Sequence, residues 1–184
     1  MPIDETLTFR PVHIALLTVS DTRVAATDTS GDILAERIAA AGHVLVTRTI
    51  VMDDPHEIGQ RVRLWIMDKA IDVIISTGGT GVTGRDVTPE ALRSIWDKEI
   101  EGFGELFRTI SYQTIGTSTI QSRACAGVAR GTYIFALPGS TGAVKDGWDG
   151  ILQYQLDSRH KPCNFVELMP RLMEKAPLVK QRPL

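Results

Sequence analysis

The sequence predicts a three-layer α/β domain, in which a mostly parallel β-sheet carries helices on both faces. Three observations predict this fold. Apolar runs of strand length recur along the 184 residues, segments with helical spacing lie between them, and polar or glycine-rich residues follow the runs. Three of the four runs are almost continuously apolar, which is typical of parallel strands covered on both faces. The alternation of strand and helix favours right-handed crossover connections.

The expected strands share one property, which is that each ends abruptly in polar residues or glycines. They are expected at residues 12–19, 44–51, 71–77 and 132–137. In an open α/β sheet, ligands bind outside the carboxyl ends of the strands. The loops that follow the four strands are therefore the places to search for a binding site.

Helices are expected between these strands. Thr29 or Ser30 can cap the first helix, and Gly42 marks its end. The second helix is amphipathic. Its apolar residues are Ile58, Val62, Trp65 and Ile66.

The third helix begins at a capping signal. Thr88 supplies a capping hydroxyl, Pro89 suits the first helical position, and Glu90 lies near the positive end of the helix. Two more helices are expected at residues 103–112 and 141–156, although three glycines weaken the second of these predictions.

The remaining segments are expected to be less regular. Residues 101–105 are expected to form a flexible segment before a helix, whose Phe103 and Phe107 belong to the core or to an interface. From residue 159 onward, four prolines limit the chain to one short helix followed by an irregular end.

Composition excludes several classes of protein. The chain has 43% hydrophobic and 23% charged residues, which are values of a globular domain and not of a disordered or fibrous chain. Its formal net charge of −2 argues against nucleic acid and anionic membranes as partners, so any phosphate must bind at a local site. Cys125 and Cys163 have no metal-ligand spacing and suit free thiols in a reducing compartment. With no signal peptide or membrane span expected, we predict a cytoplasmic protein.

Candidate ligand-binding residues follow the strands. Glycines let successive backbone N–H groups turn toward an anion, because no side chain blocks a positive φ or a close approach. The loop 77–81 and the turn 138–140, which leads into a helix, are each suited to hold a phosphate. A tight turn explains an isolated glycine pair as well, but two such loops at adjacent strand ends favour a site. The candidates are Ser20, Asp21, Thr77, Gly78, Gly79, Thr80, Gly81, Pro138, Gly139 and Ser140.

Acidic residues among these loops predict a metal-bridged nucleotide. Residues 79–84 match the dinucleotide pattern G-x-G-x-x-G, but three further residues precede the helix signal, so we interpret the match as false. Asp86 would repel a pyrophosphate unless a cation bridged the two. With Asp53 or Asp54 it would supply the few carboxylates that Mg²⁺ accepts, and phosphate oxygens and water would complete the octahedron. A solvated turn is the alternative for Asp53 and Asp54.

Short motifs are spread over most of the chain. They are residues 76–81 (STGGTG), 85–91 (RDVTPEA), 101–105 (EGFGE), 116–119 (GTST), 121–123 (QSR) and 135–141 (FALPGST). Together they resemble the molybdenum cofactor biosynthesis family that includes MoaB, MogA and the gephyrin G domain, and residues 162–165 (PCNF) are most similar to the MoaB branch. The resemblance implies a molybdopterin-binding domain at residues 10–166, followed by a C-terminal tail at 167–184.

The resemblance also implies a reaction. In the adenylyltransferase members, the terminal phosphate of molybdopterin attacks the α-phosphate of Mg-ATP and pyrophosphate leaves, before a partner enzyme inserts molybdate. By motif, Asp53 and Asp86 match the catalytic, Mg²⁺-binding acids, and Ser140 matches the serine at the pterin phosphate. Met52 stands where many members have proline, so Asp54 remains an alternative to Asp53.

Two classes of function stay open. The first is a molybdopterin adenylyltransferase that uses ATP and Mg²⁺, and the second is a non-catalytic molybdopterin-binding or scaffold protein of the same pathway. An oxidoreductase that binds NAD or flavin is a distant third. The family further implies a homotrimer or a hexamer, with the molybdate-inserting enzyme as a partner.

Overall fold

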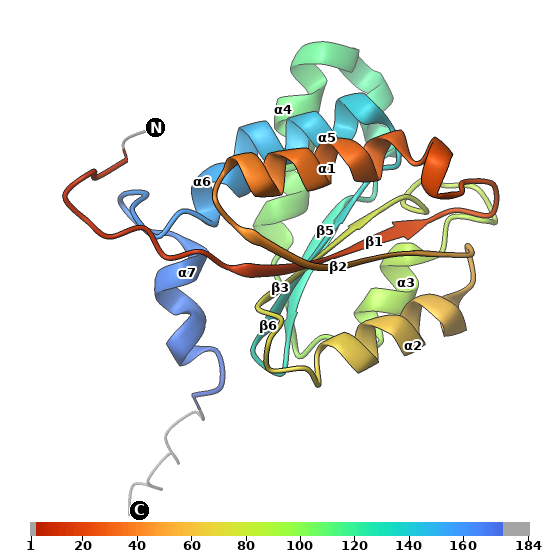
Figure 1. The fold of residues 1–184 in the computed structure, drawn as a ribbon. Coiled ribbons are helices and arrows are strands. Elements are labelled where there is room, and N and C mark those ends of the chain that lie inside the picture. The colour runs from red at the N-terminus through yellow and green to blue at the C-terminus, as the bar shows by residue number, and fades with distance from the viewer. Residues whose placement is uncertain (1–2, 175–184) are drawn as a thin grey trace, which may run out of the picture.

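The chain folds into three layers around a six-stranded sheet (Figure 1). The structure is a computed structural model, and it describes residues 3–174. The strands are β1 (His13–Val19), β2 (Val44–Val51), β3 (Val73–Thr77), β4 (Lys98–Glu99), β5 (Cys125–Ala129) and β6 (Thr132–Leu137). They lie in the order β2-β1-β3-β6-β5-β4. Neighbours among β2, β1, β3 and β6 pair in parallel, and β5 is antiparallel to β4 and β6, so the predicted mostly parallel sheet is confirmed.

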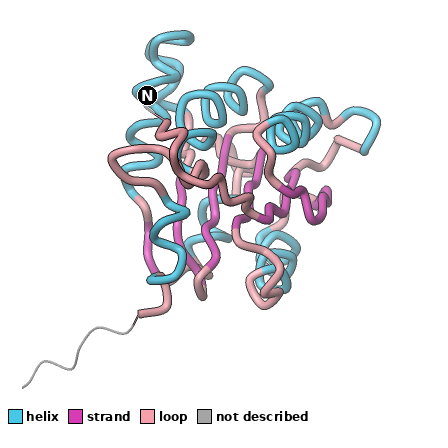
Figure 2. The backbone as a smooth tube through the Cα atoms, turned by 60° about the vertical axis from the view of Figure 1, so that its left-hand side comes forward, coloured by secondary structure: helices cyan, strands magenta, loops and turns pink. Residues whose placement is uncertain are grey.

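Helices cover both faces of the sheet, as predicted. One face carries α1 (Thr29–Ala40), α4 (Glu101–Ile115) and α5 (Thr141–Gly147), and the other carries α2 (Pro55–Trp65) and α3 (Thr88–Arg93) (Figure 1). A π-helical turn (Trp148–Leu152) and α6 (Gln153–Gln155) continue α5, so one helical segment fills the predicted range 141–156. Figure 2 shows the layers from another side, with most strands lying between helical segments.

The core consists of two apolar layers, one on each face of the sheet. All residues of β3 and β6 are buried, which explains why their sequences do not alternate between apolar and polar residues. Under α1, Leu34 and Ile38 are buried, and under α2, Ile58, Val62 and Trp65 are buried. Each large apolar side chain that is fully buried contributes about 1.5–3 kcal/mol to folding.

One hairpin was absent from the sequence-based prediction. Strands β5 and β6 pair in antiparallel fashion across the two-residue turn Arg130–Gly131, where φ is 50° and 90°. Positive φ at both turn residues gives the backbone twist that adjacent antiparallel strands require. The usual sequence signal for this turn is Asn-Gly or Asp-Gly, and arginine in the first position hid it. The prediction that strand and helix alternate throughout is therefore wrong at β5.

Two helix caps differ from the prediction. The N-cap of α1 is Asp28, whose carboxylate accepts the Gly31 N–H at 3.1 Å, and not Thr29 or Ser30. The N-cap of α3 is Val87, and the Thr88 hydroxyl does not cap the helix. At α3 the reason is a tertiary contact, because the Thr88 hydroxyl donates to the carbonyl oxygen of Gly78 at 2.9 Å.

Two further segments correct or confirm predictions. Residues 101–105 are not a flexible linker but the first turn of α4, where Phe103 and Phe107 lie in the core. The short helix α7 (Phe165–Leu168) and a 3₁₀ turn (Met169–Arg171) come after α6, as the one short helix expected beyond residue 159. The irregular end expected after this helix falls on residues 175–184, outside the described part. No helix among residues 3–174 is long and apolar enough to cross a membrane.

A buried histidine should make stability depend on pH. His43 lies between the rings of Phe9 and Trp148, and its Nδ1 accepts the Val12 N–H at 3.3 Å. Burial lowers the pKa of His43, and Asp157 offsets this only in part. The folded chain therefore keeps the imidazole neutral, whereas the unfolded chain protonates it below about pH 6.5. Stability is full above that pH and falls as the pH drops through it, by up to about 1.4 kcal/mol per pH unit.

His43→Asn provides the comparison for this prediction, because its Oδ1 can accept the same hydrogen bond without titrating. Urea unfolding at pH 8, 7, 6 and 5 should show a smaller loss of free energy of unfolding for the variant than for the wild type. Parallel curves for the two proteins would contradict the prediction.

Candidate functional site

The order of the strands places a cleft beside β1. From β1 the chain moves to β2 on one side and then returns across β1 to β3 on the other, so the strand order reverses between β1 and β3. Helices α1 and α2 lie on opposite faces for the same reason. The connections leave such a reversal point in opposite directions, and this opens a crevice at the carboxyl ends of the strands.

A cleft of about 570 Å³ lies at this point. Most of the sequence-predicted residues line it. The lining residues are Val19, Ser20, Arg23, Asp53, Gly78, Gly79, Thr80, Gly81, Arg85, Asp86, Pro138, Gly139 and Ser140. Asp21 and Thr77 were predicted to bind ligand but are absent from this lining. Thr77 is buried, and its hydroxyl donates to the carbonyl oxygen of Pro138 at 3.1 Å, so it joins the two loops that the sequence predicts to hold phosphate.

The glycine loop after β3 needs its glycines for backbone reasons. Gly78 has φ of 105° and Gly79 has φ of 63°, and a Cβ atom on Gly78 would overlap the carbonyl oxygen of Val19. The Thr88 hydroxyl donates to the carbonyl oxygen of Gly78 at 2.9 Å, and the Thr88 N–H donates to that of Gly79 at 3.0 Å. The residue predicted to cap α3 therefore fixes the loop in its left-handed conformation.

Asp53 faces the glycine loop and is tied to the loop after β1. The Asp21 N–H donates to Asp53 Oδ2 at 3.0 Å, and the Asp53 N–H donates to Asp21 Oδ1 at 3.0 Å. Asp53 Oδ1 accepts no hydrogen bond from the described residues and would lie 3.0 Å from a Cβ atom on Gly79. Burial raises the pKa of Asp53, and the charges of Asp21 and Asp86 raise it further. The hydrogen bond from the Asp21 N–H and the charge of Arg85 offset this increase only in part. A cation beside Asp53 would reverse this shift.

Asp54, the alternative second acid, has a structural role. Its Oδ1 accepts the N–H groups of His56 at 2.8 Å and Glu57 at 2.9 Å, so it is the N-cap of α2. It is absent from the cleft lining. The geometry therefore favours Asp53 over Asp54 as the acid that faces a ligand.

Asp86 lies against the other end of the glycine loop. Its Oδ2 accepts the Thr83 N–H at 2.8 Å and the Thr83 hydroxyl at 2.6 Å, and a Cβ atom on Gly81 would touch its carboxylate. Burial opposes ionisation of Asp86, but the hydrogen bonds from Thr83 and Gly81 and the charge of Arg123 outweigh it and hold the pKa below its ordinary value. Asp86 is therefore ionised at neutral pH.

Arg123 stabilises the glycine loop through hydrogen bonds to its backbone carbonyl groups. Its Nε donates to the carbonyl oxygen of Gly81 and its Nη2 to that of Asp86, both at 2.6 Å, and it pairs with Glu90. The Arg123 N–H donates to the carbonyl oxygen of Thr80 at 2.9 Å. The sequence offered only a Gln-Ser-Arg motif here, and nothing in it showed that the arginine reaches back to this loop. Arg123 holds Asp86 in place without lining the cleft.

The acidic residues fit Mg²⁺ only when a ligand supplies further oxygens. Within residues 3–174, no group of three or more His, Cys, Asp or Glu side chains could hold a metal ion. Two carboxylates, Asp53 and Asp86, line the cleft, which matches the one or two that Mg²⁺ takes beside substrate phosphates. The Thr80 hydroxyl in the same lining is buried and has no partner among the described residues. The donor set fits a phosphate-bridged Mg²⁺ ion.

A smaller pocket of about 190 Å³ adjoins the cleft and shares Thr80, Gly81, Pro138 and Ser140 with it. Its other walls combine apolar side chains with hydroxyl and amide groups. They are Phe107, Ser111, Ile115, Ser118, Gln121, Ser122 and Ala143. Ser118 and Ser122, which lie in or beside the GTST and QSR motifs, contribute hydroxyl groups to this pocket. Such a mixture suits a flat heterocycle with polar edges.

Comparison with known proteins identifies the family. Residues 15–158 match the family described as a probable molybdopterin binding domain. The chain belongs to this family. It is 50% identical over 157 residues to molybdenum cofactor biosynthesis protein B of Escherichia coli strain K12, which spans 85% of this chain and 92% of the relative.

Solved structures agree with this assignment. A crystal structure of a molybdenum cofactor biosynthesis protein B superposes with a TM-score of 0.78 at 43% identity, over 80% of this chain and 92% of the other. The tungsten cofactor synthesizing protein MoaB of Pyrococcus furiosus superposes with a TM-score of 0.70 at 38% identity, over 78% of this chain and 91% of the other. The predicted resemblance to the MoaB branch is confirmed.

Proposed function

We propose that this chain binds molybdopterin and adenylylates it with Mg-ATP, releasing pyrophosphate. The observation that carries the proposal is the cleft in which Asp53 and Asp86 flank a loop of glycines, with a second pocket alongside. The relatives of this chain are molybdenum cofactor biosynthesis proteins, and its family is that of a probable molybdopterin binding domain.

The cleft is suited to the triphosphate of ATP. Gly78 and Gly79 have no side chains, so phosphate oxygens can approach the backbone N–H groups of this loop. Asp53 and Asp86 would hold Mg²⁺ between them and the phosphates. When bound, Mg²⁺ neutralises charge on the phosphate oxygens and favours displacement at phosphorus.

The adjoining pocket is suited to the pterin. Phe107 and Ile115 offer apolar contact to the ring system, and Ser118 and Gln121 offer hydrogen bonds to its polar edge. Ser140 lies in the lining of both cavities, and its Oγ accepts the Ala143 N–H at 3.2 Å. The hydroxyl can still donate to the terminal phosphate of molybdopterin. The phosphate would then lie at the border of the two cavities, facing the α-phosphate of ATP.

The chain's contribution to the reaction is positioning and charge. An oxygen of the molybdopterin phosphate bonds to the α-phosphorus as the bond from that phosphorus to the bridging oxygen of pyrophosphate breaks. Direct transfer of this kind needs no enzyme-bound intermediate. Cys125 lies in β5, and burial raises the pKa of its thiol to about 11.

The experiment that tests this function measures pyrophosphate release from ATP by the purified chain with molybdopterin and Mg²⁺. We expect release that requires all three components and that stops when EDTA removes the metal. Tight molybdopterin binding without pyrophosphate release would contradict catalysis and would favour a binding or scaffold protein of the same pathway. The homotrimer or hexamer and the molybdate-inserting partner stay predictions, which sedimentation analysis with and without that enzyme would test.

A further inference from the structure

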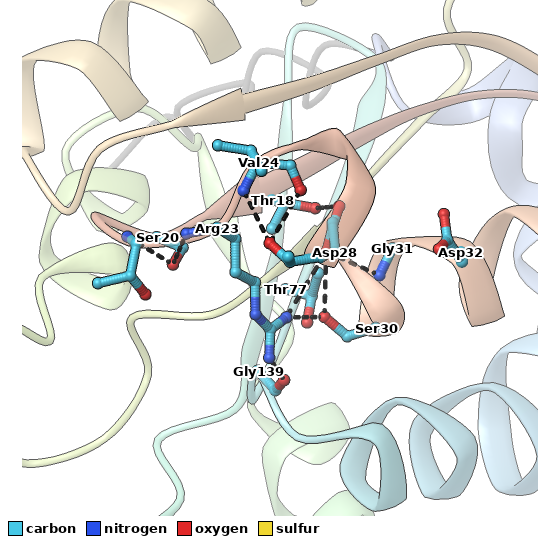
Figure 3. Close-up of polar contacts among 12 residues, drawn as sticks. Thr18, Ser20, Arg23, Val24, Asp28, Ser30, Gly31, Asp32, Thr77 and Gly139 are labelled. Atoms are coloured by element: carbon cyan, nitrogen blue, oxygen red, sulfur yellow. Dashed lines mark hydrogen bonds and ion pairs between the residues drawn. The ribbon is translucent and has the colours of Figure 1, made fainter.

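A buried carboxylate lies behind the cleft, at the start of α1 (Figure 3). Asp28 is 0% exposed, and its carboxylate accepts hydrogen bonds from the Thr18 hydroxyl at 2.6 Å, from Arg48 at 2.7 Å and from the Gly31 N–H at 3.1 Å. Burial opposes its ionisation, but these bonds outweigh burial and hold the pKa of Asp28 below its ordinary value. Asp28 is absent from the lining of the cleft.

Arg23 joins this carboxylate to the cleft. It extends from the loop after β1, and its Nη1 lies 3.5 Å from Asp28 Oδ1 and also donates to the Ser30 hydroxyl. Its Nη2 donates to the carbonyl oxygen of Gly139 at 2.8 Å. Figure 3 shows the guanidinium between Ser30 and Gly139. Since Arg23 lines the cleft and its side chain is 27% exposed, it lies between the buried acid and the Pro-Gly-Ser turn.

The charges behind Arg23 alternate in sign from the cleft to the solvent. Arg23 pairs with Asp28, and Asp28 pairs in turn with Arg48. Arg48 also donates to Asp32 at 2.6 Å. Asp32 is 61% exposed at the far end of this row. Asp28 is closer to Arg48, at 2.7 Å, than to Arg23, at 3.5 Å, so it neutralises Arg48 more completely. The row has no net charge, but its cationic end faces the cleft.

A fixed cation beside the Pro138–Ser140 turn would offset the negative charge of the acids that line the cleft. The acids that line it, Asp53 and Asp86, lie at the glycine loop and would repel an anion in the absence of a metal. Arg85 is the other arginine in the lining, but its side chain is 67% exposed and is paired with Asp21. Arg23 is held by a buried partner and retains its Nε–H, which no contact among the described residues uses.

We propose that Arg23 binds the phosphate group of the pterin ligand beside the Pro138–Ser140 turn, and that Asp28 positions Arg23 for this contact. The proposal rests on the proposed function, because that function brings a phosphorylated pterin to this turn. A guanidinium suits the task, since its N–H groups form a planar fork that matches two phosphate oxygens.

The test compares two ligands in a binding assay that needs no turnover. Fluorescence titration should show that Arg23→Gln binds molybdopterin about 10- to 100-fold more weakly than the wild type, since a hydrogen bond to a charged group is lost. Dephosphorylated molybdopterin should bind both proteins with affinities within about twofold. Arg23→Lys keeps the charge without the fork and should give an intermediate loss, and it also serves if the first variant does not fold.

Arg37→Gln is the matched control. Arg37 lies on α1, its side chain is 24% exposed, and its Nε donates to Asp149 at 2.7 Å, so the variant loses a comparable ion pair outside the cleft. Its affinity for molybdopterin should equal that of the wild type.

The positioning role of Asp28 has its own readout. Asp28→Asn should lower the affinity for molybdopterin but not for the dephosphorylated ligand, and the double variant with Arg23→Gln should bind no more weakly than Arg23→Gln alone. A merely structural role would weaken both ligands equally and would add to the loss from Arg23→Gln.

Several outcomes would overturn the inference. They are unchanged molybdopterin affinity in Arg23→Gln, an equal loss for the dephosphorylated ligand, and a loss confined to ATP, which would assign Arg23 to the nucleotide. A wild-type chain that binds molybdopterin without releasing pyrophosphate contradicts the proposed function alone, because the comparison of ligands still applies. A wild-type chain that does not bind molybdopterin would overturn both.

Discussion

Asp86→Asn is expected to slow pyrophosphate release by about 10²- to 10³-fold, which is ~3–4 kcal/mol in the activation barrier. The contacts with Thr83 should persist, because the amide oxygen of asparagine can accept both of its hydrogen bonds. The substitution removes the negative charge that would hold Mg²⁺ against the phosphates. Initial rates at saturating Mg-ATP measure the loss, and fluorescence titration should show molybdopterin affinity within about twofold of the wild type.

Asp54→Asn is the matched control for this variant. It removes a carboxylate one residue from Asp53, and asparagine is as good an N-cap as aspartate, so α2 should keep its start. The rate of pyrophosphate release should stay near that of the wild type. If Asp54→Asn lost activity and Asp86→Asn kept it, the assignment of the two metal-binding acids would be wrong.

Gly78→Ala is expected to destabilise the fold by about 3–5 kcal/mol and to abolish ligand binding. Two costs add here. Alanine is strained at φ of 105°, and its Cβ would overlap the carbonyl oxygen of Val19. That oxygen belongs to the backbone of β1, so it cannot move aside as the end of a side chain would. Urea unfolding of the variant and the wild type at pH 7.5 measures the difference in free energy of unfolding.

Gly84→Ala is the control in the same region of the chain. No atom lies within 4 Å of a Cβ atom at Gly84, and its φ is outside the left-handed range. The change should leave stability within about 1 kcal/mol of the wild type or raise it slightly, because alanine reduces the entropy of the unfolded chain. Equal unfolding midpoints for the Gly78 and Gly84 variants would show that the loop tolerates a Cβ atom and would contradict the prediction.

Local signals in the sequence were sufficient for most of the fold. The runs that became β1, β3 and β6 are almost continuously apolar, because strands covered on both faces have no polar side. The amphipathic pattern of α2 was equally clear, since one face of the helix contacts the sheet. The hairpin of β5 was missed because Arg130 at positive φ resembles no common turn signal.

The sequence by itself determined the loops that form the site, because ligands of an open α/β sheet bind at the carboxyl ends of the strands, and the polar and glycine-rich residues after the apolar runs mark those ends. Only the tertiary structure decided which residues support that site. Arg23 and Arg123 reach the turn after β6 and the loop after β3 from distant segments, and an arginine's partner depends on where the backbone carries it. Asp53 and Asp54 are adjacent residues of the same type, so the sequence does not distinguish their roles. In the structure Asp54 caps the start of α2, whereas Asp53 lines the cleft.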